Sequence, residues 1–149
     1  MSPAPQVFLD DIADKPPVMD DGKLVLVEVK KSEIRIGKDS GNPYIAIQVE
    51  VKDDEEDEGT TMFDNLMLPL EMEQGENPKA YRKRMDRRCW RLKGACKAFG
   101  VNPTGAVPQD ELAEMFIARQ AWAATKIESD DRGDRNTITA FYHLNEKPA

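Results

Sequence analysis

Alternating apolar and polar positions predict β-strands along most of the chain. The clearest pattern spans residues 44–51, where every second residue is Ile or Val and Tyr44 lies on the opposite side. A period of two is typical of a strand with one buried face. Comparable patterns predict four further strands, over residues 23–36, 60–68, 121–127 and 137–144. In the last of these, the alternation places on one side Ile138, Ala140, Tyr142 and Leu144.

The first predicted strand changes its apolar parity midway. Its valines, from Val25 to Val29, occupy odd positions, whereas Ile34 and Ile36 occupy even ones. One extra residue near positions 30–32 would restore the alternation, and such a β-bulge also bends and coils a strand. A long first strand with this bend is what a small closed barrel requires.

One long helix is predicted over residues 81–99, and a short helical turn over residues 110–116. Gly100 stands where a C-terminal cap belongs. The order of three strands, a helix and two strands is typical of the OB fold. The predicted fold class is therefore mainly β, a five-stranded OB-fold barrel with one α-helix between the third and fourth strands. The long helix carries one apolar stripe, formed by Tyr81, Met85, Cys89, Leu92, Cys96 and Phe99.

The length of 149 residues fits a single domain, which we predict to span residues 22–145. Residues 1–21 are rich in Pro and Asp, so we expect a mobile arm unless residues 7–9 dock on the domain. Residues 146–149 form a short tail. No apolar stretch is long enough to cross a membrane, and the N-terminus lacks the pattern of a secretory signal. We therefore expect a cytoplasmic protein.

Charge is distributed unevenly along the chain. The net charge is −7, yet residues 79–97 contain nine basic residues and one acidic residue. That segment carries +8, so the remainder carries −15. Several of these cations fall in the first turns of the predicted helix, where the helix dipole disfavours positive charge. Two interpretations stay open: a surface that binds phosphates, or a solvated rim that pairs with acidic segments of a neighbouring molecule.

Six adjacent carboxylates, residues 53–58, form an acidic run between the second and third predicted strands. We expect their mutual repulsion to keep the run solvated. Three interpretations are open: a solvated spacer, a patch that recruits a partner, and a self-inhibitory mimic of a DNA strand that occupies the basic groove. A divalent-metal site is not expected, because adjacent carboxylates lack the spaced ligands of calcium loops.

The sequence lacks the motifs that several kinds of catalysis require. There is no Gly-rich phosphate loop and no nucleophile elbow, and the single histidine, His143, argues against a catalytic triad. Cys89 and Cys96 lie two helical turns apart, roughly 10 Å, which is too far for a disulfide. Two cysteines and one histidine cannot supply the usual ligands of zinc. We predict a non-enzymatic protein without cofactor, catalytic residue or metal ligand.

Four ordered segments resemble a known family. They are the turn at residues 38–43, the third strand with Gly59 and residues 62–68, the helix with residues 90–93 and its ending at 98–100, and the last strand with Asn136 and residues 141–142. From about residue 22 to residue 144, the chain resembles the phage-encoded single-stranded-DNA-binding proteins with an OB fold, long filed as a domain of unknown function in phage and prophage genomes.

The resemblance implies non-catalytic, largely sequence-independent binding and protection of single-stranded DNA during phage replication or recombination, in the bacterial host cytoplasm. It implies phage recombinase or replication proteins as partners and no membrane partner, and leaves a homo-oligomer open. The acidic run is longer than this family leads us to expect, and residues 145–149 lack the acidic hook with a terminal aromatic of cellular single-strand binders. The alternatives are an acidic phage inhibitor or DNA mimic, and a protein–protein adaptor that binds a DNA-processing protein.

Binding of single strands requires cations along the phosphates and aromatic rings on the bases. OB barrels present both on the second and third strands and on the loops after the first and fourth. Tyr44 is the leading stacking candidate, with Phe63 and Trp122 as weaker ones; each could instead be a packing residue, as could Trp90. The predicted phosphate-binding residues are Lys30, Lys31, Arg35, Lys38, Arg132 and Arg135, with Arg82, Lys83, Arg84, Arg87, Arg88 and Arg91 on the helix.

Overall fold

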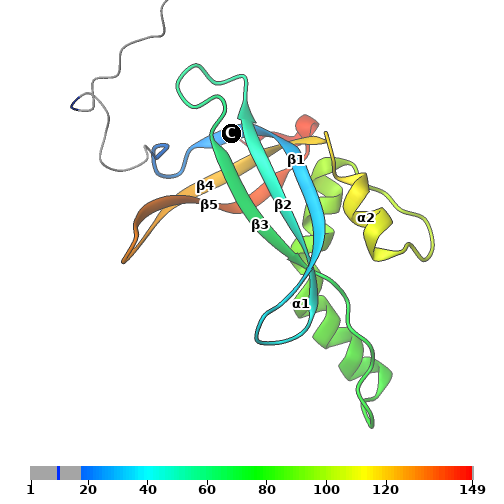
Figure 1. The fold of residues 1–149 in the computed structure, drawn as a ribbon. Coiled ribbons are helices and arrows are strands. Elements are labelled where there is room, and N and C mark those ends of the chain that lie inside the picture. Colours follow the sequence, from blue (N-terminus) through cyan, green and yellow to red (C-terminus); the bar gives the residue numbers. More distant parts are fainter. Residues whose placement is uncertain (1–9, 11–17, 149) are drawn as a thin grey trace, which may run out of the picture.

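The computed structural model describes Asp10 and residues 18–148, and its core is one five-stranded antiparallel sheet (Figure 1). The strand order across the sheet is β3-β2-β1-β4-β5. The mainly-β prediction is confirmed, with five strands and with the long helix between the third and fourth. The elements are β1 (Leu24–Ile36), β2 (Pro43–Lys52), β3 (Thr61–Met67), α1 (Pro78–Phe99), α2 (Gln109–Met115), β4 (Gln120–Asp130), β5 (Gly133–Tyr142) and the 3-10 helix η2 (Leu144–Glu146).

The predicted N-terminal arm lies mostly outside the described residues. Within its last part, Met19 is buried at 2% exposure. Its backbone N–H donates to the Asn136 side chain at 2.8 Å, and the Asn136 amide donates back to its carbonyl at 3.1 Å. The chain is therefore anchored to β5 just before β1 begins.

The predicted bulge in β1 is confirmed. The pairing of β1 with β2 shifts register between Val29 and Lys31. Before the shift the valines point into the core, and after it Ser32 and Ile34 pair with the buried Ile47 and Ile45. The extra residue thus keeps both halves of β1 facing the same core.

A second bulge, between Ala124 and Thr125 in the pairing of β4 with β5, corrects the prediction for the last strand. Ile138 pairs with the buried Thr125, whereas Ala140 pairs with the opposite-facing Ala124. Phe141, next along β5, packs against the core. The predicted shared side of Ile138 and Ala140 is wrong, because the bulge reverses the alternation between them.

The prediction of a closed five-stranded barrel is wrong, because the described strands form a sheet with two free edges. β1 pairs with β2 on one side and with β4 on the other, which leaves β3 and β5 as the two edges. These edges approach each other, but no backbone ladder joins them among the described residues. A side chain from α1, Arg91, lies between them instead, as described below.

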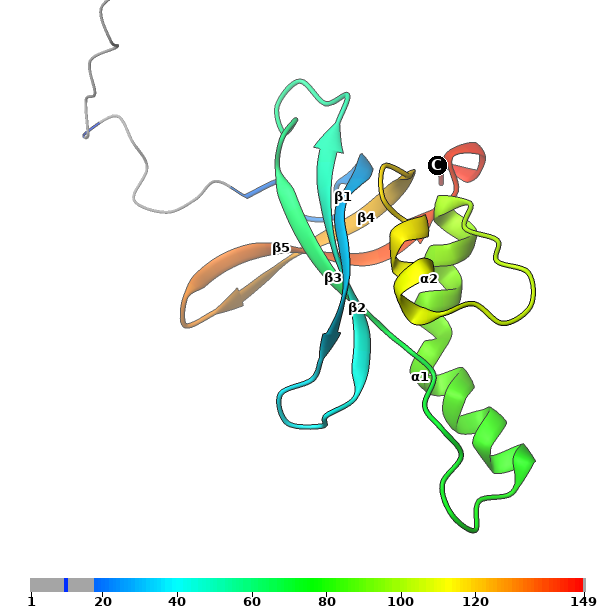
Figure 2. The same ribbon diagram turned by 45° about the vertical axis from the view of Figure 1, so that its right-hand side comes forward.

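The core fills the space between the inner face of the sheet and the C-terminal half of α1. Phe99 lies at its centre, with ring centroids 4.8 Å from Phe141 and 5.9 Å from Phe116. Of the predicted apolar stripe, Leu92 and Phe99 are buried, while the residues of the first turns are only half-buried. The reason is visible in Figure 2, where the N-terminal half of α1 extends beyond the sheet.

Both ends of α1 carry caps that the sequence specifies. The Asn77 side chain accepts a hydrogen bond from the Ala80 N–H at 2.8 Å. Gly100, the predicted cap, has φ of 70°, a left-handed conformation that favours glycine. Within the described part of the chain, no helix combines the length and apolar character needed to span a membrane.

Candidate functional site

The outer faces of β1, β2 and β3 form a shallow groove of about 220 Å³, which we call the sheet groove. Because Ile45 and Ile47 face the core, Tyr44 must face outward, as predicted. The register then aligns neighbours across the strands: Arg35 lies opposite Tyr44, and Lys31 lies opposite Gln48, which lies opposite Phe63. The sheet groove is lined by Lys31, Glu33, Arg35, Tyr44, Ala46, Ile47, Gln48, Phe63 and Asn65.

Phe63 is the most exposed large apolar side chain of the sheet, at 68%. It also lines a second hollow, of about 350 Å³, which lies between the edge strands β3 and β5. That hollow includes Arg135, a residue predicted for phosphate binding. The Phe63 side chain therefore separates the sheet groove from this second hollow, and its ring remains exposed to solvent. The structure thus brings together Lys31, Arg35, Tyr44, Phe63 and Arg135.

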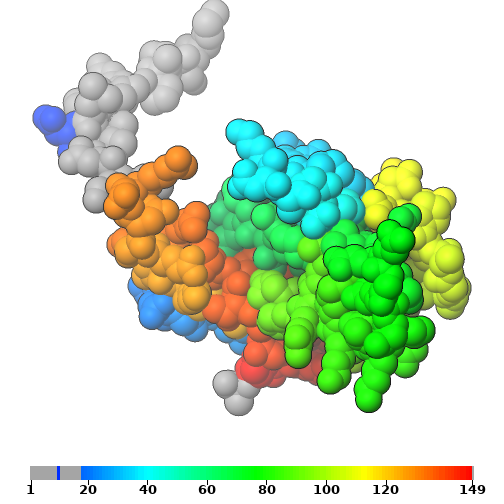
Figure 3. Space-filling view, turned by 90° about the horizontal axis from the view of Figure 1, so that it is seen from below, coloured from blue at the N-terminus to red at the C-terminus, as the bar shows by residue number. Residues whose placement is uncertain are grey.

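The surroundings of the Phe63 ring are open on one side of the molecule. Figure 3 shows the loop after β1, the hairpin between β4 and β5, and α1 standing around a recessed region that contains β3 and β5. Lys38 is exposed in the first of these loops, and Arg132 at the tip of the hairpin.

The local charges of the sheet groove are mixed. Arg35 donates from Nε to the Glu33 carboxylate at 2.7 Å, so one cation there is partly neutralised. Lys31 is exposed and has no ion pair within the described part of the chain. Arg135 lies 3.6 Å from Glu128, an exposed pair whose attraction is weak in water.

Lys30 does not join the groove. It occupies the bulge, where Nζ binds the Glu28 carboxylate at 2.6 Å. The hydrogen bond to Lys30, with a second from Gln120, lowers the pKa of Glu28. The same bond raises the pKa of Lys30. The prediction grouped Lys30 with Lys31, but the bulge separates their environments.

Three of the six predicted helix cations, all of them arginines, have structural partners. Arg84 donates two hydrogen bonds to the Glu76 carboxylate, both at 2.9 Å, and so holds the loop before α1 against the helix. Arg88 donates to the carbonyl of Leu68 at 2.7 Å and to that of Pro43 at 3.2 Å. These bonds fix the ends of β2 and β3 to the helix. Phosphate binding is therefore not needed to account for either side chain.

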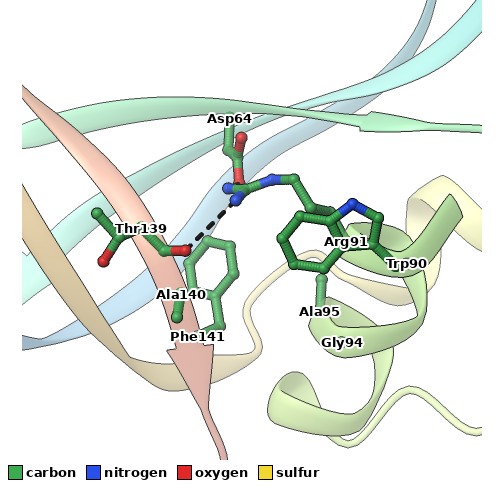
Figure 4. Close-up of a pocket in the computed structure, with 8 residues that line it drawn as sticks. All are labelled: Asp64, Trp90, Arg91, Gly94, Ala95, Thr139, Ala140 and Phe141. Carbon is green, nitrogen blue, oxygen red and sulfur yellow. Dashed lines mark hydrogen bonds and ion pairs between the residues drawn. The ribbon is translucent and has the colours of Figure 1, made fainter. Parts of the chain in front are cut away.

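Arg91 holds the two sheet edges together (Figure 4). Its Nη2 donates to Oδ2 of Asp64 in β3 at 2.6 Å and to the Ile138 carbonyl in β5 at 3.3 Å. Its Nη1 donates to the Thr139 carbonyl at 3.4 Å. Burial raises the pKa of Asp64, and the hydrogen bond and charge of Arg91 oppose that rise. A single guanidinium thus bridges the gap that backbone hydrogen bonds do not close.

The remaining predicted helix cations are free in the described structure. Arg82, Lys83 and Arg87 are exposed, and none of them forms an ion pair with residues 18–148. The basic segment was interpreted either as a phosphate-binding surface or as a rim that pairs with acidic segments of a neighbouring molecule. Both interpretations depend on these three side chains and on the exposed basic residues beside them.

Trp122 lies apart from the sheet groove, on the outer face of β4. Its Nε1 donates to the Leu144 carbonyl at 3.3 Å, and the ammonium of Lys147 lies 4.2 Å from its ring centroid. The C-terminal segment therefore covers part of this ring. Its alternative interpretation as a packing residue fits these contacts.

Trp90, which the sequence suggested as a packing residue, is 63% exposed. A signal for this was present, because position 90 lies about 200° around the helix from the buried Leu92. Glu33 was also missed, although its place between two outward cations follows from the same alternation.

The acidic run is not solvated throughout. Lys23 binds the carboxylates of Asp54 and Asp57, with Asp54 at 3.0 Å. Asp54 also accepts hydrogen bonds from the N–H groups of Glu56 and Asp57. The bond to Lys23 lowers the pKa of Asp54, and both bonds raise that of Lys23. The expectation of full solvation is wrong for these two carboxylates, because Lys23 offsets their repulsion.

The groups used in redox and metal chemistry are sparse in this part of the chain. Cys89 and Cys96 are half-buried free thiols, and burial raises the pKa of each. Across Asp10 and residues 18–148, no three His, Cys, Asp or Glu side chains are grouped so as to hold a metal ion. Comparison with protein-family models gives no match, and comparison with curated proteins gives no significant similarity.

Proposed function

We propose that this protein binds single-stranded DNA, without chemistry, across the sheet groove and over Phe63. The observation that carries the proposal is the exposed Phe63 ring, with Tyr44 and Lys31 in the groove on one side and Arg135 in the hollow on the other. A solvent-facing aromatic with cations on both sides matches the two terms that hold single strands. Base stacking contributes about 1–3 kcal/mol per base.

The strand arrangement supports an OB fold of the partly open type. The long, bulged β1 pairs with both β2 and β4, and the two edges that would close a barrel face each other across Arg91. OB folds bind oligonucleotides on strands 2 and 3 and between the loops after strands 1 and 4. The sheet groove and Phe63 occupy the corresponding positions.

The cellular role belongs to the same proposal. The family resemblance supports protection of single-stranded DNA in phage replication or recombination, in the cytoplasm of the bacterial host. Phage recombinase or replication proteins would then be partners, with a homo-oligomer as an open alternative. The net charge of −7 weakens long-range attraction to DNA, so binding depends on the local cations and on stacking.

The test is a titration of the protein with a fluorescent 30-nucleotide oligothymidine, followed by anisotropy at several salt concentrations. A duplex of equal length is titrated beside it. We expect binding of the single strand that weakens with salt, and weaker binding of the duplex. Phe63→Ala should raise Kd about 5- to 150-fold through the loss of one stacking platform. Met72→Ala, at an exposed position away from the groove, is the matched control.

Two results would contradict the proposal. The first is no binding of the oligomer by the wild-type protein at low salt. In that case the acidic inhibitor or the adaptor function would account better for the negative charge. The second is equal affinity of the Phe63→Ala and Met72→Ala variants, which would remove the observation on which the site depends.

A further inference from the structure

Trp90 is an exposed indole in the middle of a basic helix face. The core side of α1 is marked by Leu92, Ala95 and Phe99. Trp90 is 63% exposed and lies on the flank of α1, where it borders the hollow between the helix and the edges of β3 and β5. The guanidinium carbon of Arg91 lies 5.6 Å from the centroid of the Trp90 ring. The rest of the ring is exposed and is available to a flat partner.

Hollows flank this ring on both sides. One, of about 560 Å³, lies against Met85, Cys89 and Pro69. The other, of about 120 Å³, lies against Arg91 and Phe141 (Figure 4). Gly94 lines both, and a side chain added there would meet no atom within 4 Å. The missing side chain at Gly94 therefore leaves open the space one turn beyond Trp90.

Unpaired cations run along the same helix face. Lys83, Arg87, Lys93 and Lys97 are all exposed, and none forms an ion pair within residues 18–148. Lys83 and Arg87 lie one turn apart before Trp90, and Lys93 and Lys97 lie one turn apart after it. From Lys83 to Lys97 the row is about 21 Å long at 1.5 Å per residue. A row of this kind suits a ligand with repeated negative charges.

The smaller hollow connects this face to the proposed DNA path. Besides Trp90, it is lined by Asp64 of β3 and Thr139 of β5. Asp64 follows Phe63 directly in β3, and Phe63 lines the hollow further along the same pair of edges. Because Phe63 and Asp64 face opposite sides of β3, a strand that leaves Phe63 would cross the edges of β3 and β5 to reach Trp90.

We propose that Trp90 is a second base-stacking site for single-stranded DNA, with Arg87, Lys93 and Lys97 holding the phosphates beside it. This inference rests on the proposed function, which it extends from the sheet to the helix. An acidic peptide is the competing ligand for a basic face. The hollows on both sides of the Trp90 ring leave room for successive stacked bases, and cations spread over several turns match successive phosphates. An acidic peptide would use Trp90 only as a single apolar contact, so nucleotides fit this face better.

The experiment uses tryptophan fluorescence, because the chain has two tryptophans. In Trp122→Phe, Trp90 is the only reporter; in Trp90→Phe, the partly covered Trp122 is the matched control. Each variant is titrated with a 30-nucleotide oligothymidine and with a glutamate peptide of equal charge. Trp90→Ala and Phe63→Ala are titrated by anisotropy, and circular dichroism checks that each variant is folded.

We expect the oligomer to quench the Trp122→Phe variant and to leave the Trp90→Phe variant nearly unquenched. We expect Trp90→Ala to raise Kd for the oligomer about 5- to 150-fold. Unchanged affinity of Trp90→Ala together with weakened binding by Phe63→Ala would overturn this inference and leave the proposed function standing. Equal quenching of Trp90 by the glutamate peptide would identify a peptide-binding face and also overturn it. No oligomer binding by the wild-type protein would overturn both proposals.

Discussion

Replacing Arg91 with Ala tests whether this arginine stabilises the fold by bridging β3 and β5. The substitution removes the charged hydrogen bond to Asp64 and two longer bonds to the carbonyls of Ile138 and Thr139. A hydrogen bond to a charged group contributes about 1.5–3 kcal/mol, and a carboxylate left buried without its partner adds to the loss. The Asp64 side chain is only 14% exposed. We expect the free energy of unfolding to fall by about 2–4 kcal/mol.

The assay is urea unfolding followed by circular dichroism. With a slope of roughly 2 kcal/mol per M, the midpoint should fall by about 1–2 M. Arg87→Ala is the matched control, because Arg87 is an exposed arginine one turn earlier on the same helix and has no ion pair within residues 18–148. Its effect should stay within about 0.5 kcal/mol.

The reasoning is refuted if Arg91→Ala and Arg87→Ala unfold at the same urea concentration. Arg91→Lys gives an intermediate check, because a lysine keeps the charge near Asp64 but lacks the planar fork that also reaches the two carbonyls. If Arg91 bound phosphate instead, its loss would weaken DNA binding and leave stability unchanged.

Three further predictions follow from other contacts. Burial holds the pKa of Asp64 above its ordinary value in the folded chain, so the folded state binds that proton more tightly than the unfolded state does. The wild type should therefore lose stability relative to Asp64→Asn as the pH rises above the ordinary pKa of an aspartate, about 4; urea unfolding at a series of pH values measures it, and the opposite trend would mean that Arg91 outweighs burial. Gly100→Ala should lower the free energy of unfolding by about 1 kcal/mol, because φ is 70° there, and an unchanged urea midpoint would contradict this. Lys23→Ala should free the acidic run and raise its cleavage rate by a glutamate-specific protease; equal rates would show that Lys23 does not hold it.

The parts of the fold that local periodicity decides could be predicted from the sequence. The outward position of Tyr44 follows from the alternation in β2, and the bulge in β1 follows from the shift in parity between Val29 and Ile34. The bulge in β5 could not be found in this way. Ala140 and Phe141 are both apolar, so the pattern remains acceptable in either phase.

The roles of the helix arginines depend on contacts that are distant in sequence. Arg88 binds a carbonyl 20 residues away, and Arg91 binds one that is 48 residues away. A row of arginines looks uniform along the chain, so its division into structural and exposed members appears only once the strands are placed beside the helix. Trp90 differs, because its position on the helix wheel already placed it away from Leu92.

The bulge at Lys30 separates the residue that bends β1 from the residues that line the exposed face of the sheet. The extra backbone position sets the curvature of β1, and therefore the angle at which the β2–β3 hairpin meets β4 and β5. The side chains that line the sheet groove come after it, from Lys31 onward, and they take no part in that bend. Substitutions of the groove residues can therefore change the charge and shape of the exposed face without changing the curvature of the sheet.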